Sequence, residues 1–476
     1  MPADAPVVSA RRELIGRGSV YTLASAVQAA SMLLVLPVVT RILAPSPYGF
    51  VVTAGVVAQL VSVMASLGIN SSVMLEYFEG GDGPARARRL VGVVVLVSLL
   101  VVGVTELTGP LWSRGFAEIP YGLDLRLAIW SALPLAVLGA AQSMLRSMGR
   151  PVAYVCATLT ATVGGHALGA LLVVATDGGA TAYLSGVLIG ATAGALAGLA
   201  QGGIARPTKA DQAMVRRALR VGLPLIPHVV AIFALLAADR LVIEQILGLR
   251  AAGRYQVAYL IGGAGVSLFV AVNNAWSPLV FGADPERRWS VLASTTRDLE
   301  RLTPALIGLI GLTAPVVVGL AAPAAYDPAA LTQVTVVVAA SALPFLWYLA
   351  SVHVVLFCRR TGVLARATPM ATVLAVAANV VVLGRFGLMG AAVVTVASYG
   401  FLAWRVRRAA DRLAAVPWDR SGSRRTLVAV IAVVALALVL PASGPWVAVR
   451  AAVATALVGQ AARQLATPSE RAPSPA

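Results

Sequence analysis

The sequence predicts an all-α polytopic membrane protein with about fourteen transmembrane helices. Apolar stretches follow one another from residue 20 to residue 465, and crossing a bilayer core takes about 20 apolar residues of helix. Hydrophobic residues make up 59% of the 476 residues and charged residues only 12%, roughly half the charged fraction of a soluble domain. Most of the arginines fall in every second gap between the apolar stretches, which is the charge pattern of a multi-pass membrane protein.

Glycines, prolines and charge clusters divide the chain into fourteen expected spans. Their bounds are 18–40, 47–77, 89–112, 125–147, 151–175, 180–204, 220–247, 254–282, 299–321, 329–358, 362–383, 387–408, 425–441 and 446–465. The first apolar stretch is too long for the hydrophobic region of a signal peptide and runs straight into Arg41, so we expect a retained helix.

The basic residues predict the orientation of the spans. With the N-terminus in the cytoplasm, 28 of the 37 Lys and Arg residues fall on the cytoplasmic side, as the positive-inside rule requires. Missing one helix would invert every later loop and remove this asymmetry. We therefore expect a multi-pass protein of the bacterial cytoplasmic membrane with both termini in the cytoplasm. The same bias accounts for the net charge of +17, so no nucleic acid partner is expected.

Several function classes are excluded by what the chain lacks. Cys156 and Cys358 both lie in apolar stretches, which argues against a disulfide framework, and the three histidines are too far apart in sequence to predict a metal cluster. The single lysine, Lys209, does not end a glycine-rich loop, so no P-loop is predicted. Every expected outer loop is short. We therefore expect a protein that is not an enzyme and needs no cofactor or metal.

The domain organisation follows from one long cytoplasmic segment, 205–219, which divides the chain into six spans and eight. An even number of spans before the break makes both halves begin on the same side of the membrane. We expect an N-terminal six-helix bundle (1–204), a linker (205–219), a C-terminal six-helix bundle (220–408) and two additional helices with a tail (409–476). Two parallel bundles around a central cavity are a transporter architecture.

Polar residues recur on one face of several spans. In the second span Gln59, Ser62, Ser66 and Asn70 share a face at helical spacing. Similar stripes run through the first, fourth and eighth spans, which include Gln28, Arg146 and Asn274. Such residues either join helices through hydrogen bonds or line a wet cavity. Because several spans carry stripes, the pattern favours a shared polar cavity.

The seventh span carries the heaviest polar load. Arg240 and Glu244 are four residues apart and are expected to pair along the helix. Asp239 shares a face with His228 and lies further into the membrane, so it is the better candidate for coupling to a cation. The alternative is that Asp239 pairs with an arginine of a neighbouring helix. Two prolines three residues apart, just before His228, are expected to bend the helix.

Short runs in both halves carry a family resemblance. They are Thr40-Arg41-Ile42-Leu43, LPLIPH at 223–228, ADRLVI at 238–243, GRYQVA at 253–258 and NNAWSP at 273–278. The chain resembles, over nearly its whole length, the polysaccharide transporters of the multidrug/oligosaccharidyl-lipid/polysaccharide exporter superfamily. The resemblance implies a flippase that moves an undecaprenyl-pyrophosphate-linked oligosaccharide across the membrane by alternating access.

The resemblance also implies the partners and the candidate residues. Its partners would be the lipid-linked glycan, membrane lipid, H⁺ or Na⁺ as the coupling ion, and a glycan polymerase or glycosyltransferase. An anionic headgroup requires a wet, cationic cavity. The candidates for substrate binding are Gln28, Arg41, Asn70, Arg146, His228, Arg240, Arg254, Asn273 and Asn274. The candidates for ion coupling are Asp239 and Glu244. Glu76 departs from the pattern, because a basic residue is expected there, so Arg146 is the alternative cation.

Three other functions remain as alternatives. A flippase for the cell-wall precursor lipid II is the nearest relative of the first interpretation and also has fourteen spans. A multidrug or cation antiporter of the same superfamily would need acidic residues deep in the cavity, where Glu106 and Asp239 are the candidates. A membrane enzyme such as a glycan polymerase would need a large outer loop bearing Arg or His.

Overall fold

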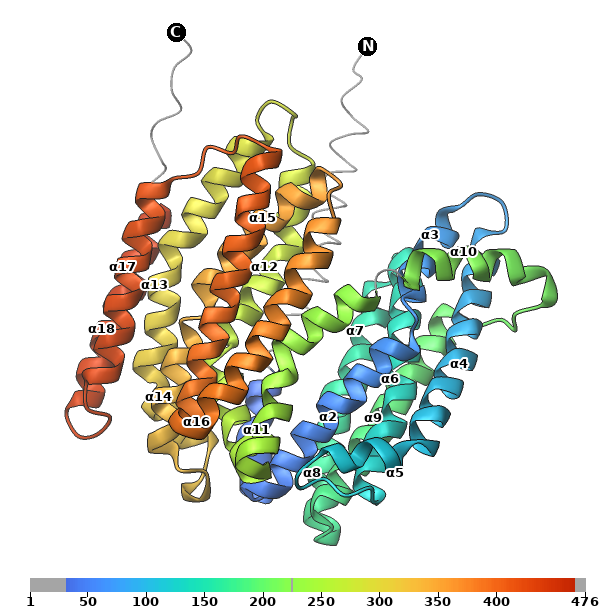
Figure 1. The fold of residues 1–476 in the computed structure, drawn as a ribbon, viewed down its shortest axis with the longest axis horizontal. Helices are drawn as coiled ribbons and strands as arrows, with labels where there is room; N and C mark the ends of the chain where they lie inside the picture. Colours follow the sequence, from blue (N-terminus) through green and yellow to red (C-terminus); the bar gives the residue numbers. More distant parts are fainter. Residues whose placement is uncertain (1–30, 224–225, 467–476) are drawn as a thin grey trace. The chain divides into compact units, whose positions relative to one another are not determined.

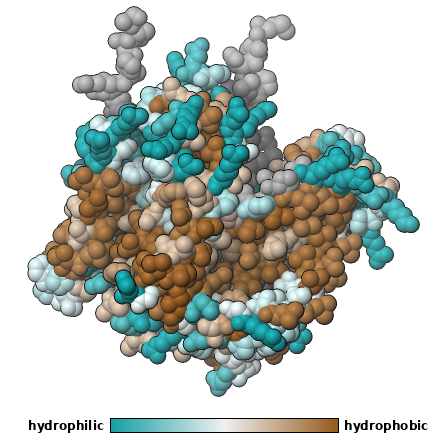
Figure 2. All heavy atoms as spheres, in the orientation of Figure 1, coloured by the Kyte–Doolittle hydropathy of each residue, from teal (hydrophilic) through white to brown (hydrophobic). Residues whose placement is uncertain are grey.

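The computed structural model describes residues 31–223 and 226–466, and within these residues it contains helices, turns and no strand (Figure 1). The predicted all-α membrane fold is therefore confirmed. Among the residues that the structure describes, ten helices are long and apolar enough to cross a bilayer. Figure 2 shows apolar residues across the middle of the visible face and hydrophilic residues at its two ends, the distribution expected of helices surrounded by lipid.

The apolar helices lie where the sequence predicts spans. They are Pro45–Ala65, Gly83–Leu107, Leu123–Ser147, Pro151–Thr176, Gly179–Gly202, Ala264–Phe281, Arg288–Ala321, Pro328–Phe357, Gly362–Leu413 and Arg420–Val439. The segment Gly362–Leu413 covers two predicted spans, because the helix continues through a kink at Gly387 (φ 53°, ψ −144°). The total of fourteen spans stays a prediction.

The chain forms two compact units. Unit 1 comprises Met1–Val257, Ala321–Tyr326 and Leu364–Val394. Its helices are Ser31–Ile42, α2 (Pro45–Ala65), α3 (Ile69–Phe78), α4 (Gly83–Leu107), α5 (Gly109–Trp112), α6 (Leu123–Ser147), α7 (Pro151–Leu159), the π-helical turn η2 (Thr160–Gly164), α8 (Gly165–Thr176), α9 (Gly179–Gly202), α10 (Gln212–Gly222) and most of α11 (Ile226–Gly262).

Unit 2 comprises Ala258–Leu320, Asp327–Val363 and Thr395–Ala476. It contains α12 (Ala264–Phe281), α13 (Arg288–Ala321), α14 (Pro328–Ala339), α15 (Ala342–Phe357), α17 (Arg420–Val439) and α18 (Trp446–Ala466), while α16 (Gly362–Leu413) contributes to both units. The division into bundles at 1–204 and 220–408, with a linker at 205–219 and two extra helices in 409–476, stays a prediction.

Small residues let the helices of unit 1 pack closely. A Cβ on Gly186 of α9 would lie 2.2 Å from the backbone nitrogen of Gly169 in α8, so only glycine allows this approach. Close backbone contact through small residues stabilises helix pairs in lipid, where burial of apolar surface gives little driving force. The glycines of the sixth predicted span therefore serve helix packing.

The linker between the predicted halves contains an amphipathic helix, α10. Met214 and Ala218 of α10 are buried in a core cluster that includes Ile69 of α3 and Met144 of α6. Asp211, just before α10, forms an ion pair with Arg89 of α4 at 2.9 Å. These contacts fix the linker to the body of unit 1.

The second predicted span is not one continuous helix. The chain leaves the helical conformation at Leu67 (φ 45°) and Gly68 (φ 67°), which separates α2 from α3. The predicted stripe from Gln59 to Asn70 is therefore wrong: Gln59 is exposed on α2, while Asn70 lies on α3. The helical spacing of polar residues does not reveal that two residues with positive φ change the direction of the chain between α2 and α3.

A polar cluster joins α17 to the other helices of unit 2. Glu300 of α13 is 3% exposed, and its Oε1 accepts hydrogen bonds from the Trp347 indole (2.6 Å) and the Ser423 hydroxyl (2.8 Å). At the start of α17, the N–H of Gly422 and the hydroxyl of Ser421 donate to Asp419, and these bonds lower the pKa of its carboxyl. Because every partner is a donor, Glu300 acts as a buried anchor for α17.

Candidate functional site

The most buried charges among the predicted site residues lie on α11. Asp239 is 8% exposed and Arg240 is 4% exposed. The Nη1 of Arg240 lies 2.7 Å from the Oδ1 of Asp239, and its Nε donates to Gln256 Oε1 at 3.0 Å. The guanidinium also lies 5.9 Å from the centre of the Tyr255 ring. The neighbouring carboxylate thus compensates the buried positive charge.

The predicted pair between Arg240 and Glu244 is wrong. Arg240 instead forms an ion pair with Asp239, the preceding residue on the same helix. The alternative, in which Asp239 pairs with an arginine of a neighbouring helix, is therefore also wrong. Glu244 is fully buried, and its Oε1 accepts a hydrogen bond from the backbone N–H of Glu118 at 2.8 Å. The i,i+4 spacing made the pair possible, but a contact from a distant loop replaced it.

Glu118 is the functional candidate that the sequence did not indicate. It lies in the loop between α5 and α6, and its Oε2 accepts a hydrogen bond from the backbone N–H of Leu249 at 2.7 Å. Leu249 follows Gly248, whose backbone angles (φ 80°, ψ 172°) kink α11. The loop therefore contacts α11 on both sides of its kink. No local pattern in the sequence marks a contact across more than a hundred residues.

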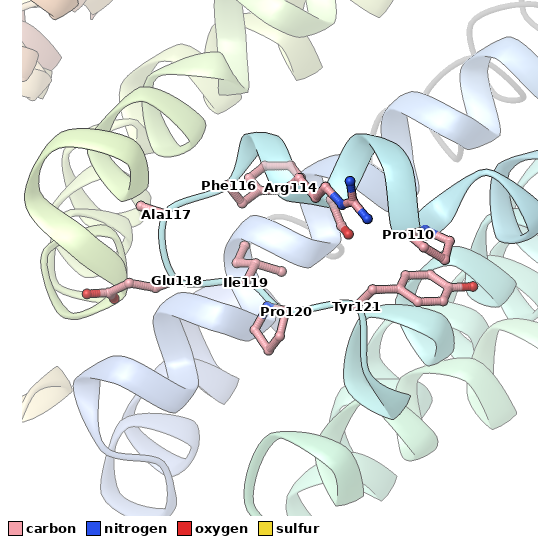
Figure 3. Close-up of a pocket in the computed structure, with 9 residues that line it drawn as sticks. Pro110, Arg114, Phe116, Ala117, Glu118, Ile119, Pro120 and Tyr121 are labelled. Atoms are coloured by element: carbon pink, nitrogen blue, oxygen red, sulfur yellow. The ribbon is translucent and has the colours of Figure 1, made fainter.

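The loop that carries Glu118 also forms an open cleft of about 550 Å³. Arg114, Phe116 and Tyr121 are among its lining residues (Figure 3). In Figure 3 the carboxylate of Glu118 points away from Arg114 and Tyr121, toward the neighbouring helix. The loop thus presents a mixed aromatic and cationic surface on one side and a carboxylate to α11 on the other.

The segment after the kink packs closely against the start of α2. A Cβ on Gly253 would lie 2.1 Å from the carbonyl oxygen of Pro45, so the two backbones are in direct contact. Arg254 donates through Nε to the carbonyl oxygen of Tyr326 at 2.9 Å, and the Tyr326 hydroxyl donates to Leu43 at 2.7 Å. Arg254 is thus part of the packing that holds this end of unit 1 together.

Arg41 and Arg146 are the exposed cations among the predicted site residues. Arg41 donates through Nη1 to the carbonyl oxygen of Pro37 at 2.7 Å. Arg146 donates to the Ser143 hydroxyl at 3.2 Å and lies 5.8 Å from the centre of the Tyr154 ring. Because both side chains are exposed, an anion can reach either guanidinium group.

The predicted polar residues are placed on separate helices. Asn70 lies against α6, where its Nδ2 is 2.8 Å from the position of a Cβ on Gly139. Asn273 is half-buried and Asn274 is exposed on α12 of unit 2. Gln28 lies outside the described residues, and so does the side chain of His228, whose backbone belongs to α11.

The sequence profile of a family described as "Polysaccharide biosynthesis protein" matches residues 15–282, more than half of the chain. The chain belongs to this family. No curated protein matches the sequence. The solved structures that this chain resembles share the fold of the multidrug/oligosaccharidyl-lipid/polysaccharide exporter superfamily.

Three solved structures illustrate the likeness. The lipid II flippase MurJ, in an inward closed conformation, is 11% identical with a TM-score of 0.70, covering 94% of this chain and 99% of its own. An inward-facing multidrug transporter of the MATE family is 16% identical with a TM-score of 0.62, covering 84% and 95%. A superfamily transporter from Pyrococcus furiosus is 14% identical with a TM-score of 0.57, covering 88% and 96%.

The chain thus has the fold of these transporters and of the flippase. Within the polysaccharide biosynthesis family, Glu76 departs from the basic residue that the resemblance implies. Glu76 is 5% exposed, and its carboxylate pairs with Arg86 at 3.0 Å and Arg217 at 3.4 Å. The acidic residue is therefore neutralised by two arginines, and basic groups are still present at this end of α3.

Proposed function

We propose that the protein is a flippase that moves an undecaprenyl-pyrophosphate-linked oligosaccharide from the cytoplasmic to the outer leaflet of the bacterial cytoplasmic membrane. The observation that carries this proposal is the polysaccharide biosynthesis family match over residues 15–282. The arginine distribution supports an orientation with both termini in the cytoplasm. Alternating access would carry the headgroup through the protein while the polyprenyl chain stays in lipid.

The exposed arginines support a role in binding the pyrophosphate. A diphosphate held without a metal needs guanidinium donors, which bind phosphate through charge-assisted hydrogen bonds. Arg41 and Arg146 are exposed, whereas Arg240 is buried and Arg254 is half-buried. We therefore assign the first contacts with the anion to Arg41 and Arg146. Contacts with the sugars are proposed for Gln28, Asn70, His228, Asn273 and Asn274.

The energy source is proposed to be an ion gradient or removal of the product. The lone Lys209 does not end a glycine-rich loop, so the sequence carries no P-loop lysine for ATP hydrolysis. H⁺ or Na⁺ could act on Asp239 or Glu244 of α11, because buried carboxylates in spans commonly lie on ion pathways. A glycan polymerase or glycosyltransferase that consumes the flipped product would make movement directional.

Transport by purified protein in liposomes tests the proposal. A fluorescent undecaprenyl-pyrophosphate oligosaccharide is incorporated, and its appearance in the opposite leaflet is followed with a membrane-impermeant quencher. Arg41→Gln and Arg146→Gln should each slow flipping roughly tenfold, since a hydrogen bond to a charged group contributes about 1.5–3 kcal/mol. Arg385→Gln and Arg360→Gln, which change exposed arginines elsewhere, are the matched controls and should flip at the native rate.

Two outcomes would overturn the proposal at different levels. Native rates from both Arg41→Gln and Arg146→Gln would reject the binding site and leave the function standing. Failure of the native protein to move any polyprenyl-linked oligosaccharide, under conditions in which a known flippase works, would reject the function.

A lipid II flippase is the second candidate. The observation in its favour is the TM-score of 0.70 with the lipid II flippase MurJ over 94% of this chain. The same liposome assay with fluorescent lipid II separates the two candidates. Faster movement of lipid II than of an oligosaccharide lacking the peptide would favour the second.

A further inference from the structure

The end of α16 that the charge pattern predicts to be cytoplasmic carries arginines at positions 405, 407, 408 and 412. One of them, Arg407, is compensated within unit 2. Its Nε lies 3.1 Å from Oδ1 of Asp411, and its guanidinium lies 3.7 Å from the centre of the Trp418 ring. The Trp418 indole donates to the same Oδ1 at 3.1 Å. Asp411 is therefore already bound to a cation and to an indole.

The other three arginines share one face of α16 with two aromatic residues. We call this surface the α16 arginine face; its residues, at helical spacing, are Phe401, Trp404, Arg405, Arg408 and Arg412. The guanidinium carbon of Arg408 lies 4.3 Å from the centre of the Trp404 ring, and that of Arg405 lies 6.0 Å from it. Trp404 is 46% exposed. A single exposed indole thus holds two cations near each other.

The positive charge of this face has no counter-charge. Within residues 31–223 and 226–466, no carboxylate lies at ion-pair distance from Arg405, Arg408 or Arg412. The Nε of Arg405 is buried and has no hydrogen-bond partner in the same part of the chain. A buried donor without an acceptor is costly, and guanidinium groups bind phosphate oxygens through charge-assisted hydrogen bonds. An anion with several acceptor oxygens would satisfy these groups.

The place of the face along its span indicates where such an anion comes from. Arg408 ends the predicted span 387–408, so the face lies at the level of the lipid headgroups. Tryptophan is enriched at this level, and basic residues beside a span attract anionic lipids. Phe401 lies one turn further into the span, with its ring centre 5.8 Å from that of Trp404. Cations next to an apolar edge match a phospholipid better than a soluble anion.

We propose that the α16 arginine face binds the phosphate group of an anionic phospholipid of the cytoplasmic leaflet. Arg405 and Arg408 donate to the phosphate oxygens, and Arg412 adds a third positive charge one turn beyond them. Trp404 keeps the two guanidinium groups in place and contacts the glycerol and upper acyl region of the lipid. The site needs no glycan substrate, so it stands or falls separately from the proposed function.

Native mass spectrometry of the full-length protein tests the proposal. Protein purified in detergent micelles is titrated with phosphatidylglycerol or with zwitterionic phosphatidylcholine of the same acyl chains, and bound lipids are counted. The first phosphatidylglycerol should bind about tenfold more tightly than the first phosphatidylcholine, because the arginines bind a lipid with net charge better than a zwitterion.

Three double variants separate a specific site from diffuse attraction. Arg405→Gln/Arg408→Gln should lose the preference for phosphatidylglycerol. Arg405→Lys/Arg408→Lys keeps both charges but not the planar fork, so its preference should fall about threefold. Arg359→Gln/Arg360→Gln removes two exposed charges from the same predicted side of unit 2 and should keep the native preference. The lysine variant keeps the test decisive if the glutamine variant does not fold.

Several results would overturn the inference. Equal binding of the two lipids by the native protein rejects the site. A native preference in the lysine variant, or an equal loss in Arg359→Gln/Arg360→Gln, would show that net charge alone attracts the lipid. Displacement of phosphatidylglycerol by inorganic phosphate would assign the face to a soluble anion. Displacement by an equimolar amount of undecaprenyl pyrophosphate would assign it to the proposed substrate instead.

Discussion

Removing the carboxylate of Asp239 should destabilise the protein by about 3–5 kcal/mol, the usual loss when one partner of a buried ion pair is deleted. Both side chains are well buried, with Asp239 8% and Arg240 4% exposed, and their charged atoms are 2.7 Å apart. Asp239→Asn keeps the size of the side chain and leaves the Arg240 guanidinium buried with a neutral acceptor, Gln256, at 3.0 Å. An amide oxygen cannot compensate a full positive charge that is buried inside the protein.

A double-mutant cycle isolates the contribution of the pair. Asp239→Asn and Arg240→Gln should each be strongly destabilising, whereas the double variant should lose less than the sum of the two, with a coupling energy of about 2 kcal/mol or more. Stability is measured by reversible unfolding in mixed micelles. Asp177→Asn changes an exposed carboxylate at the C-terminal end of α8 and should stay within about 0.5 kcal/mol of the native protein.

Two results would refute this reasoning. A loss below about 1 kcal/mol in Asp239→Asn would show that the charge of Arg240 does not depend on this carboxylate. A coupling energy below about 0.5 kcal/mol, the usual limit for independent sites, would show that the two residues do not act as a pair.

Two further predictions concern the anchors of α10 and α17. Burial acts to raise the pKa of Asp211, but hydrogen bonds from Thr208 and the charge of Arg89 outweigh it and lower the pKa. A carboxyl group whose pKa is lower in the folded protein than in the unfolded chain stabilises the fold at any pH above its unfolded-state pKa of about 4. That stability is lost as the pH falls below about 4 toward the pKa of Asp211 in the folded protein, so proteolysis of segment 205–219 should accelerate there. Cleavage rates that do not change with pH in this range would contradict the prediction. Glu300→Ala should lower the free energy of unfolding by about 2–3 kcal/mol, because it leaves the Ser423 hydroxyl and the Trp347 indole N–H without an acceptor. A loss of less than about 0.5 kcal/mol would show that α17 does not need this anchor.

The positions of the spans could be predicted because they depend on local sequence. A helix crosses a bilayer only if about 20 consecutive residues are apolar, and the described apolar helices from Pro45–Ala65 to Arg420–Val439 lie at the predicted places. The family resemblance could be read in the same way, since the runs around Asp239 and Arg254 are contiguous. The break between α2 and α3 was missed, because positive φ at Leu67 leaves no trace in hydropathy.

The partners of the charged residues could not be predicted from spacing. Helical periodicity allowed Arg240 to pair with Glu244, yet Arg240 pairs with Asp239. Glu244 instead accepts a hydrogen bond from Glu118, 126 residues earlier in the chain. Hydrogen bonds of this kind form only after packing brings distant backbone groups together, and buried polar groups take whichever partner the packing supplies.

The sequence by itself thus determined that the chain is an all-helical membrane protein of the polysaccharide biosynthesis family, because hydrophobic length, charge distribution and short motifs are properties of consecutive residues. Only the tertiary structure decided which charges are buried in pairs and which stay exposed. It paired Arg240 with Asp239, left Arg41 and Arg146 exposed, and set the Glu118 loop on the kink of α11. The physical reason is that desolvation and pairing depend on neighbours in space, which local sequence does not specify.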